Sequence, residues 1–155
     1  MNMGIRNREI RNEFWQGFAP KFATKCDFFK GISVVNNHET WYRRVINGVH
    51  IGFSVKNWAR NRNVGVFIHL ESTCREWNKR IFDFFEQNQA QIEKVFGEPL
   101  NWQRNNNRIS SRIDFTENLN LNDPLSRQAI EDFLTKQMQK LITTFMPYIC
   151  QVPQK

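Results

Sequence analysis

The segment WYRRVINGVHIGFSV, residues 41–55, constrains the fold more strongly than any other part of the chain. Its Asn47–Gly48 pair favours a two-residue hairpin turn, because both turn positions need a positive φ. This turn pairs Ile46 with Val49, and every second residue onward from Val49 is apolar. The segment therefore predicts an antiparallel hairpin with one buried face and one polar face.

Two adjacent arginines interrupt the pattern in the first strand of this hairpin. The two-residue turn pairs Arg44 with Ile51 and Tyr42 with Phe53, which places Arg44 on the core side. A three-residue turn would place Arg43 there instead. Whichever arginine lies on the core side needs a partner or a route to solvent, because a buried unpaired charge is costly.

Two segments before and after the hairpin have the apolar spacing of helices that bury one face. Residues 7–19 form the first, and Pro20 should kink or end it. Thr73 and Glu76 have the spacing of a capping box, which predicts the start of one long helix that Gly97 stops. The apolar positions expected to face the core are Ile10, Phe14, Phe18, Phe22, Trp77, Ile81, Phe84, Phe85, Ile92, Val95 and Phe96.

Three more strands and a last helix follow from the same kind of pattern. Alternation over residues 64–70 predicts the third strand, and alternation on both sides of the RNNNR loop, residues 104–108, predicts the fourth and fifth. Asp123 and Pro124 should begin the last helix, which runs toward Pro147. The strand residues expected to point inward are Val64, Val66, Ile68, Leu70, Leu100, Trp102, Ile109, Ile113 and Phe115.

The predicted order of elements is α-βββ-α-ββ-α. Strand hairpins interrupted by helices indicate an α+β fold, in which helices cover one face of a mainly antiparallel sheet. We therefore predict one domain over residues 1–155, with a five-stranded sheet and three main helices. The other face of the sheet should be open and polar and should present His50, Ser54, Lys56, Phe67, His69, Gln103, Arg108, Ser110 and Arg112.

Positive charge is concentrated in two segments of the chain. The formal net charge is +7, yet residues 41–70 and 99–113 contain no Asp or Glu. A local excess of this kind is typical of a surface that meets a polyanion. The basic stretches 56–63 and 104–108 should lie at opposite ends of the sheet, because the long helix spans its length. Only the open face would join them.

These basic segments supply the candidate contacts to nucleic acid. Arginine outnumbers lysine 13 to 9, and the guanidinium group is the better fork for phosphate. Trp41, Trp58 and Phe67 are interleaved with the charge and would stack on bases. The competing interpretation is that the arginines are only solvated and that Trp41 and Phe67 pack under a loop or helix. The candidates are Arg43, Lys56, Trp58, Arg60, Arg62, Arg104, Arg108 and Arg112.

Metal-dependent chemistry has little support in the sequence. Cys26, Cys74 and Cys150 lie far apart and outside any zinc-ligand spacing, so reduced thiols are expected. The chain lacks the acid and acid-x-Lys pattern of a metal-dependent nuclease, and it lacks a Gly-rich phosphate loop. We expect no metal and no cofactor.

Two histidines are the remaining candidates for acid–base chemistry. His50 and His69 should share the open face on neighbouring strands, close to Ser54, and Glu71 is the only acid nearby. A triad needs all of these groups within hydrogen-bond reach, and exposed strand histidines are usually inert. We therefore assign no catalytic residue.

Four motifs stand out along the chain: FW-x-x-F at residues 14–18, GVFIHLE at 65–71, IEKVFGEPLNWQR at 92–104 and SSRIDF at 110–115. Together they resemble a bacterial and archaeal family that is catalogued as domain of unknown function 4268. The resemblance extends from about residue 12 to residue 147. Members often follow an endonuclease-like domain, so the resemblance implies an accessory role near DNA cleavage, repair or phage defence. It carries over no catalytic residues.

The functional expectation combines the basic face with this resemblance. We expect a non-catalytic accessory domain of a DNA-processing, restriction or phage-defence system, which contacts DNA or RNA weakly through its basic sheet face. The alternative is a protein-interaction or dimerisation module that docks a separately encoded endonuclease-like protein or forms a homodimer; a stand-alone nuclease is less favoured. No apolar run approaches the length of a membrane span, so we expect no membrane contact and a cytoplasmic location.

Overall fold

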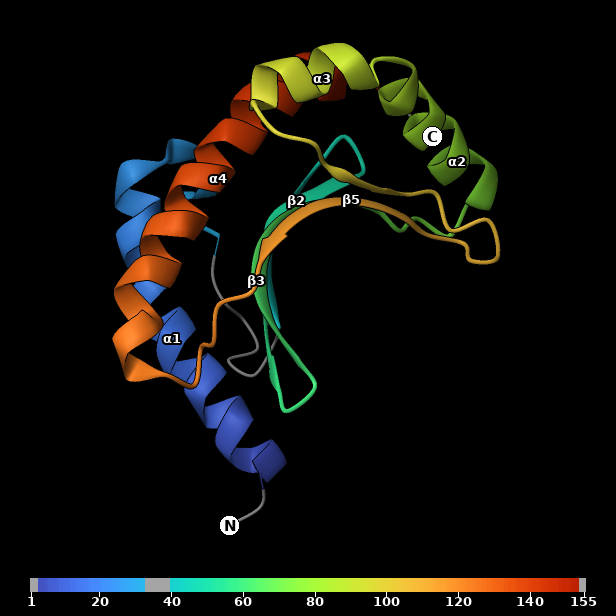
Figure 1. Ribbon diagram of the computed structural model, residues 1–155. Helices are drawn as coiled ribbons and strands as arrows, with labels where there is room; N and C mark the ends of the chain where they lie inside the picture. Colours follow the sequence, from blue (N-terminus) through green and yellow to red (C-terminus); the bar gives the residue numbers. More distant parts are fainter. Residues whose placement is uncertain (1–2, 33–39, 154–155) are drawn as a thin grey trace.

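The computed structural model describes residues 3–32 and 40–153 of the chain. They form an α+β fold with a five-stranded sheet, four α-helices and two short 3-10 helices (Figure 1). The helices are α1 (Met3–Lys25), η1 (Asp27–Phe29), α2 (Arg75–Gln87), α3 (Gln89–Phe96), η2 (Pro124–Ser126) and α4 (Arg127–Ile149). The strands are β1 (Trp41–Ile46), β2 (Val49–Trp58), β3 (Asn61–Leu70), β4 (Asn101–Gln103) and β5 (Ser111–Glu117).

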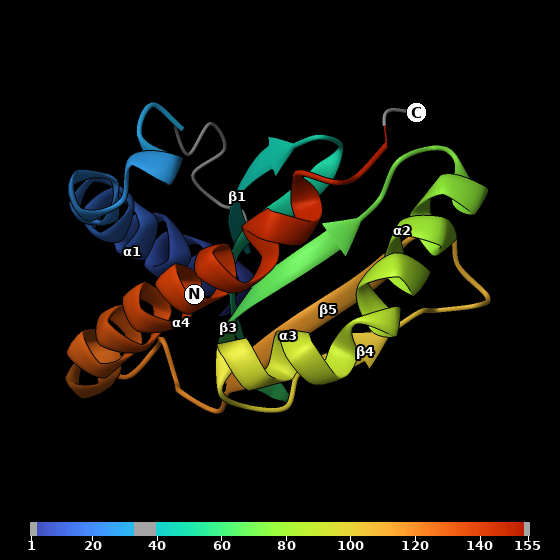
Figure 2. The same ribbon diagram turned by 90° about the horizontal axis from the view of Figure 1, so that it is seen from above.

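The sheet has the order β1-β2-β3-β5-β4, and every neighbouring pair of strands is antiparallel. It is strongly arched, and the helices lie along its convex side (Figures 1 and 2). Within the described residues, no helix covers the concave side. The predicted α+β class, strand number and open face are therefore confirmed, with four α-helices in place of three main ones.

The predicted β1–β2 hairpin is confirmed in its turn and in its register. Asn47 and Gly48 have φ values of 51° and 79°, and Arg44 is opposite Ile51. Arg44 consequently lies on the core side, where its guanidinium donates a hydrogen bond to the Phe28 carbonyl and covers the Phe28 ring at 4.6 Å. The charge of the half-buried Arg44 is thus satisfied by η1.

The helix boundaries differ from the prediction in two places. Pro20 does not end the first helix, because α1 continues to Lys25; Pro20 is exposed, so the carbonyl that it leaves without an N–H partner can bind water. The long second helix is divided at Asn88, whose side chain donates to the Phe84 carbonyl at 2.9 Å. Gly97 ends α3 with a φ of 95°, as predicted.

The capping box predicted for α2 is wrong. The helix begins at Arg75 and has no side-chain cap at Cys74. The buried Asn78 instead reaches back to Ser72: its Oδ1 accepts from the Ser72 N–H at 3.1 Å, and its Nδ2 donates to the Ser72 carbonyl at 2.9 Å. A residue inside the helix therefore fixes the chain just before α2, but it does not cap the N–H groups of the first turn.

The core lies between the convex face of the sheet and the helices. Phe18 and Phe22 of α1 pack edge-on against Phe53 of β2, with ring centroids 5.3 and 4.9 Å apart. On the other side of the core, Phe145 of α4 packs against Phe85 of α2. None of the described helices is long and apolar enough to span a membrane.

Candidate nucleic-acid interface

The concave face carries the side chains that strand parity predicts. His50, His69, Arg112 and Gln103 form one row across four strands. A second row contains Gly52, Phe67, Asp114 and Asn101, and Arg43 extends it onto β1. The expected pairing of His50 with His69 on the open face is confirmed.

Two of the predicted contacts, Arg43 and Arg112, lie in these two rows, and each is paired with a carboxylate. Arg43 Nη1 lies 2.7 Å from Glu71 Oε1, and Arg112 Nε lies 2.8 Å from Asp114 Oδ2. Arg112 also covers the ring of Phe67 at 4.4 Å, which leaves Phe67 only 2% exposed. The centre of the face is therefore compensated in charge, and Phe67 is not available for stacking on a base.

Arg104 lies on the helix side of the sheet instead. Its Nε and Nη2 donate to the two carboxylate oxygens of Asp83 on α2, at 2.8 and 3.0 Å. These hydrogen bonds hold the pKa of Asp83 below its usual range. A bidentate pair with an ionised carboxylate makes Arg104 a weaker candidate for a phosphate contact.

The predicted strand position of Arg108 is wrong, and so is the inward position of Ile109. The fifth strand begins only at Ser111, and Arg108 lies in the preceding loop, where its N–H donates to the Asn105 carbonyl at 2.8 Å. Ile109 is 55% exposed. Arg108 is nevertheless exposed and has no ion pair with a described residue.

The remaining four candidates lie together at the end of the β2–β3 hairpin. The tip of this hairpin lies in the lower part of Figure 1, beside the N-terminal half of α1. Arg60 and Arg62 are exposed, Lys56 is half-buried, and Trp58 keeps 43% of its surface exposed. Within the part of the chain that the structure describes, none of the three cations has an ion pair with a carboxylate.

A buried polar network holds this hairpin against α1. The guanidinium of Arg11 lies 5.4 Å from the centre of the Trp58 ring and donates to Asn57 Oδ1 at 2.8 Å. Asn57 in turn donates to the Asn7 carbonyl and to Asn122 Oδ1, both at 3.0 Å. Arg11 was not among the predicted residues, although Arg11 and Asn7 lie four and eight residues before the buried Trp15 and so share its side of α1.

The histidine cluster is organised around Glu71. His50 Nδ1 lies 3.3 Å from one carboxylate oxygen of Glu71, and His69 Nδ1 lies 3.1 Å from the other. Burial lowers the pKa of His69 to about 4, although Glu71 acts in the opposite direction, so this imidazole is neutral at neutral pH. Ser54 lies four residues along β2 from His50, about 13 Å away at strand spacing, so the serine and the histidines do not form a triad.

No group of three metal-ligating side chains is found among the described residues. Cys26 is half-buried, Cys74 and Cys150 are exposed, and all three are free thiols. The polar side chains of the concave face can therefore bind and orient polar groups, but the described residues do not form a metal site.

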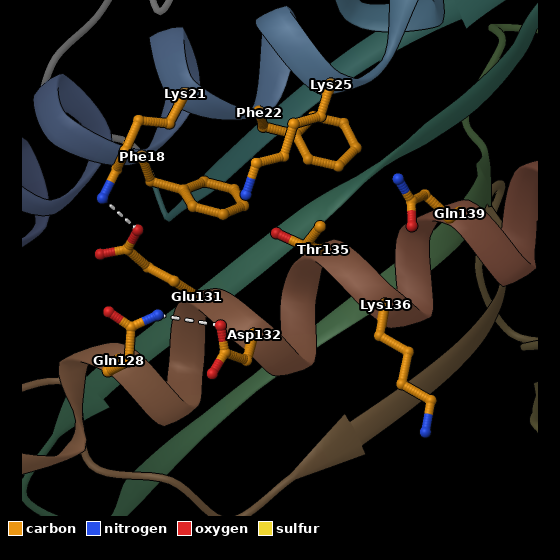
Figure 3. Close-up of a pocket in the computed structure, with 10 residues that line it drawn as sticks. All are labelled: Phe18, Lys21, Phe22, Lys25, Gln128, Glu131, Asp132, Thr135, Lys136 and Gln139. Carbon is orange, nitrogen blue, oxygen red and sulfur yellow. Dashed lines mark hydrogen bonds and ion pairs between the residues drawn. The ribbon is translucent and has the colours of Figure 1, made fainter.

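A cleft of about 420 Å³ separates α1 from α4 on the far side of the core (Figure 3). Lys21 and Glu131 form an ion pair across it, and Gln128 donates to Asp132 at 2.9 Å. Figure 3 shows Lys136 pointing away from the cleft. The charges that face this cleft are thus largely compensated, unlike those of the β2–β3 hairpin.

The comparison with known families agrees with these structural elements. A family model described as a domain of unknown function, DUF4268, matches residues 10–149. The chain belongs to this family. No curated protein and no solved structure matches the chain at a significant level.

All eight candidate contacts lie inside the part of the chain that matches DUF4268. The motifs that carried the resemblance in the sequence are mostly packing residues and helix ends: Phe14 and Phe18 fill the core, and Gly97 ends α3. Membership of DUF4268 therefore accounts for the fold, and an argument about function has to rest on the surface chemistry of this chain.

Proposed function

We propose that this protein is an accessory domain of a DNA-processing, restriction or phage-defence system and contacts nucleic acid through its β2–β3 hairpin. The observation that supports the proposal is that Lys56, Arg60 and Arg62 lie at the same end of the β2–β3 hairpin as the partly exposed ring of Trp58; Lys56 is on the same side of β2 as Trp58, and Arg62 is opposite Asn57. These cations are not neutralised by a described carboxylate, whereas Arg43, Arg104 and Arg112 are. Unneutralised cations beside an exposed aromatic ring are the combination that non-sequence-specific binders use.

The two components would act differently on affinity. Each cation that neutralises a phosphate releases a counterion, so binding should weaken steeply with salt. Stacking of a base on Trp58 would add about 1–3 kcal/mol and would depend little on salt. Trp58 is already positioned by Arg11 and Asn57, so little ordering is needed on binding.

Fluorescence anisotropy with labelled single-stranded DNA, single-stranded RNA and duplex DNA tests this proposal at several salt concentrations. The double variant Arg60→Glu/Arg62→Glu should bind at least tenfold more weakly, and its slope of log affinity against log salt should fall by about 1.4–1.8. The matched control is Lys30→Glu/Lys94→Glu, which makes the same charge change at exposed positions after η1 and on α3.

Two results would count against the hairpin. One is a loss of affinity in the control as large as that in Arg60→Glu/Arg62→Glu, which would indicate diffuse attraction by net charge alone. The other is the absence of binding to any of the three nucleic acids at low salt. The variant Arg108→Glu/Arg112→Glu separately tests the opposite end of the sheet.

A protein-interaction or dimerisation module is the second candidate, favoured by the edge strand β1. Trp41 and Val45 lie on its concave side and are 42% and 52% exposed. A sheet edge with exposed apolar side chains can pair with an edge strand of another chain. Sedimentation equilibrium at high salt would then show a dimer that Val45→Lys returns to monomer, while nucleic-acid binding needs no such dimer.

A further inference from the structure

Another cleft, which has a cationic lining, lies along α2, at the end of the sheet away from the β2–β3 hairpin. Its volume is about 700 Å³, which is within the range of small-molecule sites. The cleft is formed by one side of α2 and by the segment that follows β4. Its lining residues are Arg75, Glu76, Lys79, Arg80, Asp83, Phe84, Gln87 and Arg104.

The cleft keeps an excess of positive charge after its internal pairs are counted. Asp83 and Arg104 form a bidentate ion pair and cancel one another. The three remaining cations, Arg75, Lys79 and Arg80, face a single remaining carboxylate, that of Glu76. The lining therefore carries a net charge of about +2.

The ammonium group of Lys79 adds to this excess because only neutral groups bind it. Lys79 Nζ donates to the carbonyls of Arg104, Asn105 and Ser110 and to Ser111 Oγ. Burial lowers the pKa of Lys79, and repulsion from Arg75 and Arg104 lowers it further. The repulsion among these cations indicates a positive electrostatic potential in the cleft, which a bound anion would reduce.

The two outer guanidinium groups are presented toward solvent at the start of α2. Arg75 is anchored by a hydrogen bond to the Asn106 carbonyl, which fixes it without neutralising it. Arg80 is exposed and forms no ion pair with a described residue. Arg75 is the first residue of a 13-residue helix, where the helix dipole also favours an anion, and Arg80 lies in the next turn.

We propose that this cleft binds a terminal phosphate, a phosphate monoester held between Arg75 and Arg80. A monoester carries about −1.5 to −2 charges at neutral pH and so matches the cleft, whereas a diester in a nucleic-acid backbone carries only one. The half-buried ring of Phe84 borders the same space and would contact the sugar or base attached to the phosphate. The phosphate belongs either to a free mononucleotide or to the 5′ end of a nucleic acid. The site goes beyond the proposed function, because it shares no residue with the β2–β3 hairpin.

NMR titrations of the full chain at constant ionic strength test this site, with inorganic phosphate, AMP, adenosine and a tetranucleotide with or without a 5′-phosphate. We expect saturable shifts in the first turns of α2 and in residues 104–110 with inorganic phosphate, AMP and the 5′-phosphorylated tetranucleotide, and none there with adenosine or the 5′-hydroxyl tetranucleotide. The variant Arg75→Gln/Arg80→Gln should weaken phosphate binding at least tenfold. The matched control Lys30→Gln/Lys94→Gln should bind like the wild type.

A comparison of the affinities for AMP and for the 5′-phosphorylated tetranucleotide shows which molecule carries the phosphate. Tighter binding of AMP than of the phosphorylated tetranucleotide supports a free mononucleotide, and the reverse order supports a nucleic-acid end. Shifts that do not saturate, or that Arg75→Gln/Arg80→Gln leaves unchanged, overturn the proposal. Failure of the hairpin proposal is distinguishable, because Arg60→Glu/Arg62→Glu should retain phosphate binding in this cleft.

Discussion

Replacing Lys79 with methionine removes the group that holds the 104–110 loop on the fold. Lys79 is 6% exposed, and its ammonium donates to four acceptors on either side of that loop. Two of them keep another partner in the variant: the Arg104 carbonyl accepts from Ser111 Oγ at 2.7 Å, and the Asn105 carbonyl accepts from the Arg108 N–H at 2.8 Å. Among the described residues, the Ser110 carbonyl accepts a hydrogen bond from Lys79 alone.

The expected cost follows from this unequal loss. Leaving the Ser110 carbonyl without a donor and losing the charge-assisted hydrogen bonds would each destabilise the folded protein by about 1–3 kcal/mol. Part of this loss is offset, because the variant no longer has to bury an ammonium group that lacks a carboxylate partner. We expect Lys79→Met to destabilise the protein by about 2 kcal/mol. Urea unfolding at pH 7 should then show a midpoint lowered by about 1 M with an unchanged slope.

The matched control is Lys94→Met, an exposed lysine on α3, which should change stability by less than about 0.5 kcal/mol. Hydrogen exchange should show faster exchange at the Arg108 amide in Lys79→Met, because the loop loses its attachment. An unchanged or higher midpoint for Lys79→Met would refute the reasoning, since it would mean that desolvation of the ammonium outweighs its hydrogen bonds.

Two further predictions concern the concave face. Because burial lowers the pKa of His69 from 6.5 to about 4, the unfolded chain binds more protons between these values, so stability should fall by about 1–3 kcal/mol as pH drops through this window. His69→Gln should flatten this dependence in urea unfolding at pH 4.5 and 7, and an unflattened profile would contradict the assignment. Gly65→Ala would place its Cβ 2.7 Å from both the Phe115 carbonyl and Thr116 Cγ2, so thermal unfolding should show a loss of about 1–3 kcal/mol. Gly17→Ala, which meets nothing within 4 Å on α1, should instead gain about 0.5–1 kcal/mol; equal effects at the two glycines would contradict the packing argument.

The parts of the fold that the sequence predicts well are those that local chemistry decides. The Asn47–Gly48 turn requires positive φ at two positions, and this requirement fixes the β1–β2 register residue by residue. Gly97 ends α3 for the same kind of reason. The capping box does not form: no side chain caps α2 at Cys74, and Asn78 instead fixes the preceding chain through the N–H and carbonyl of Ser72.

The fifth strand shows how far alternation alone can be extended. Ile113 points inward as expected, but alternation continued backward to Ile109 cannot tell where pairing stops. The hydrogen bond from Lys79 to the Ser110 carbonyl holds the preceding segment in a loop, and Lys79 lies 31 residues away in sequence. A contact at that separation has no local signal.

The same limit applies to the candidate interface. The alternation of side chains along a strand predicts which face of the sheet an arginine lies on. It does not predict whether a carboxylate forms an ion pair with that arginine. Arg43 is 28 residues from Glu71, and Arg104 is 21 residues from Asp83, so neither pair could be inferred from spacing. The pair of Arg112 with Asp114 could have been inferred, because residues two apart on one strand share a face.

The two unneutralised cationic regions lie at opposite ends of β3, and this separation sets a length scale. Ten residues of strand, Asn61–Leu70, extend over about 33 Å. A duplex rises about 3.4 Å per base pair, so a 5′-phosphorylated fragment shorter than about ten base pairs would reach one region and miss the other. Measured affinity should therefore depend on ligand length in two stages rather than rise smoothly with each added nucleotide.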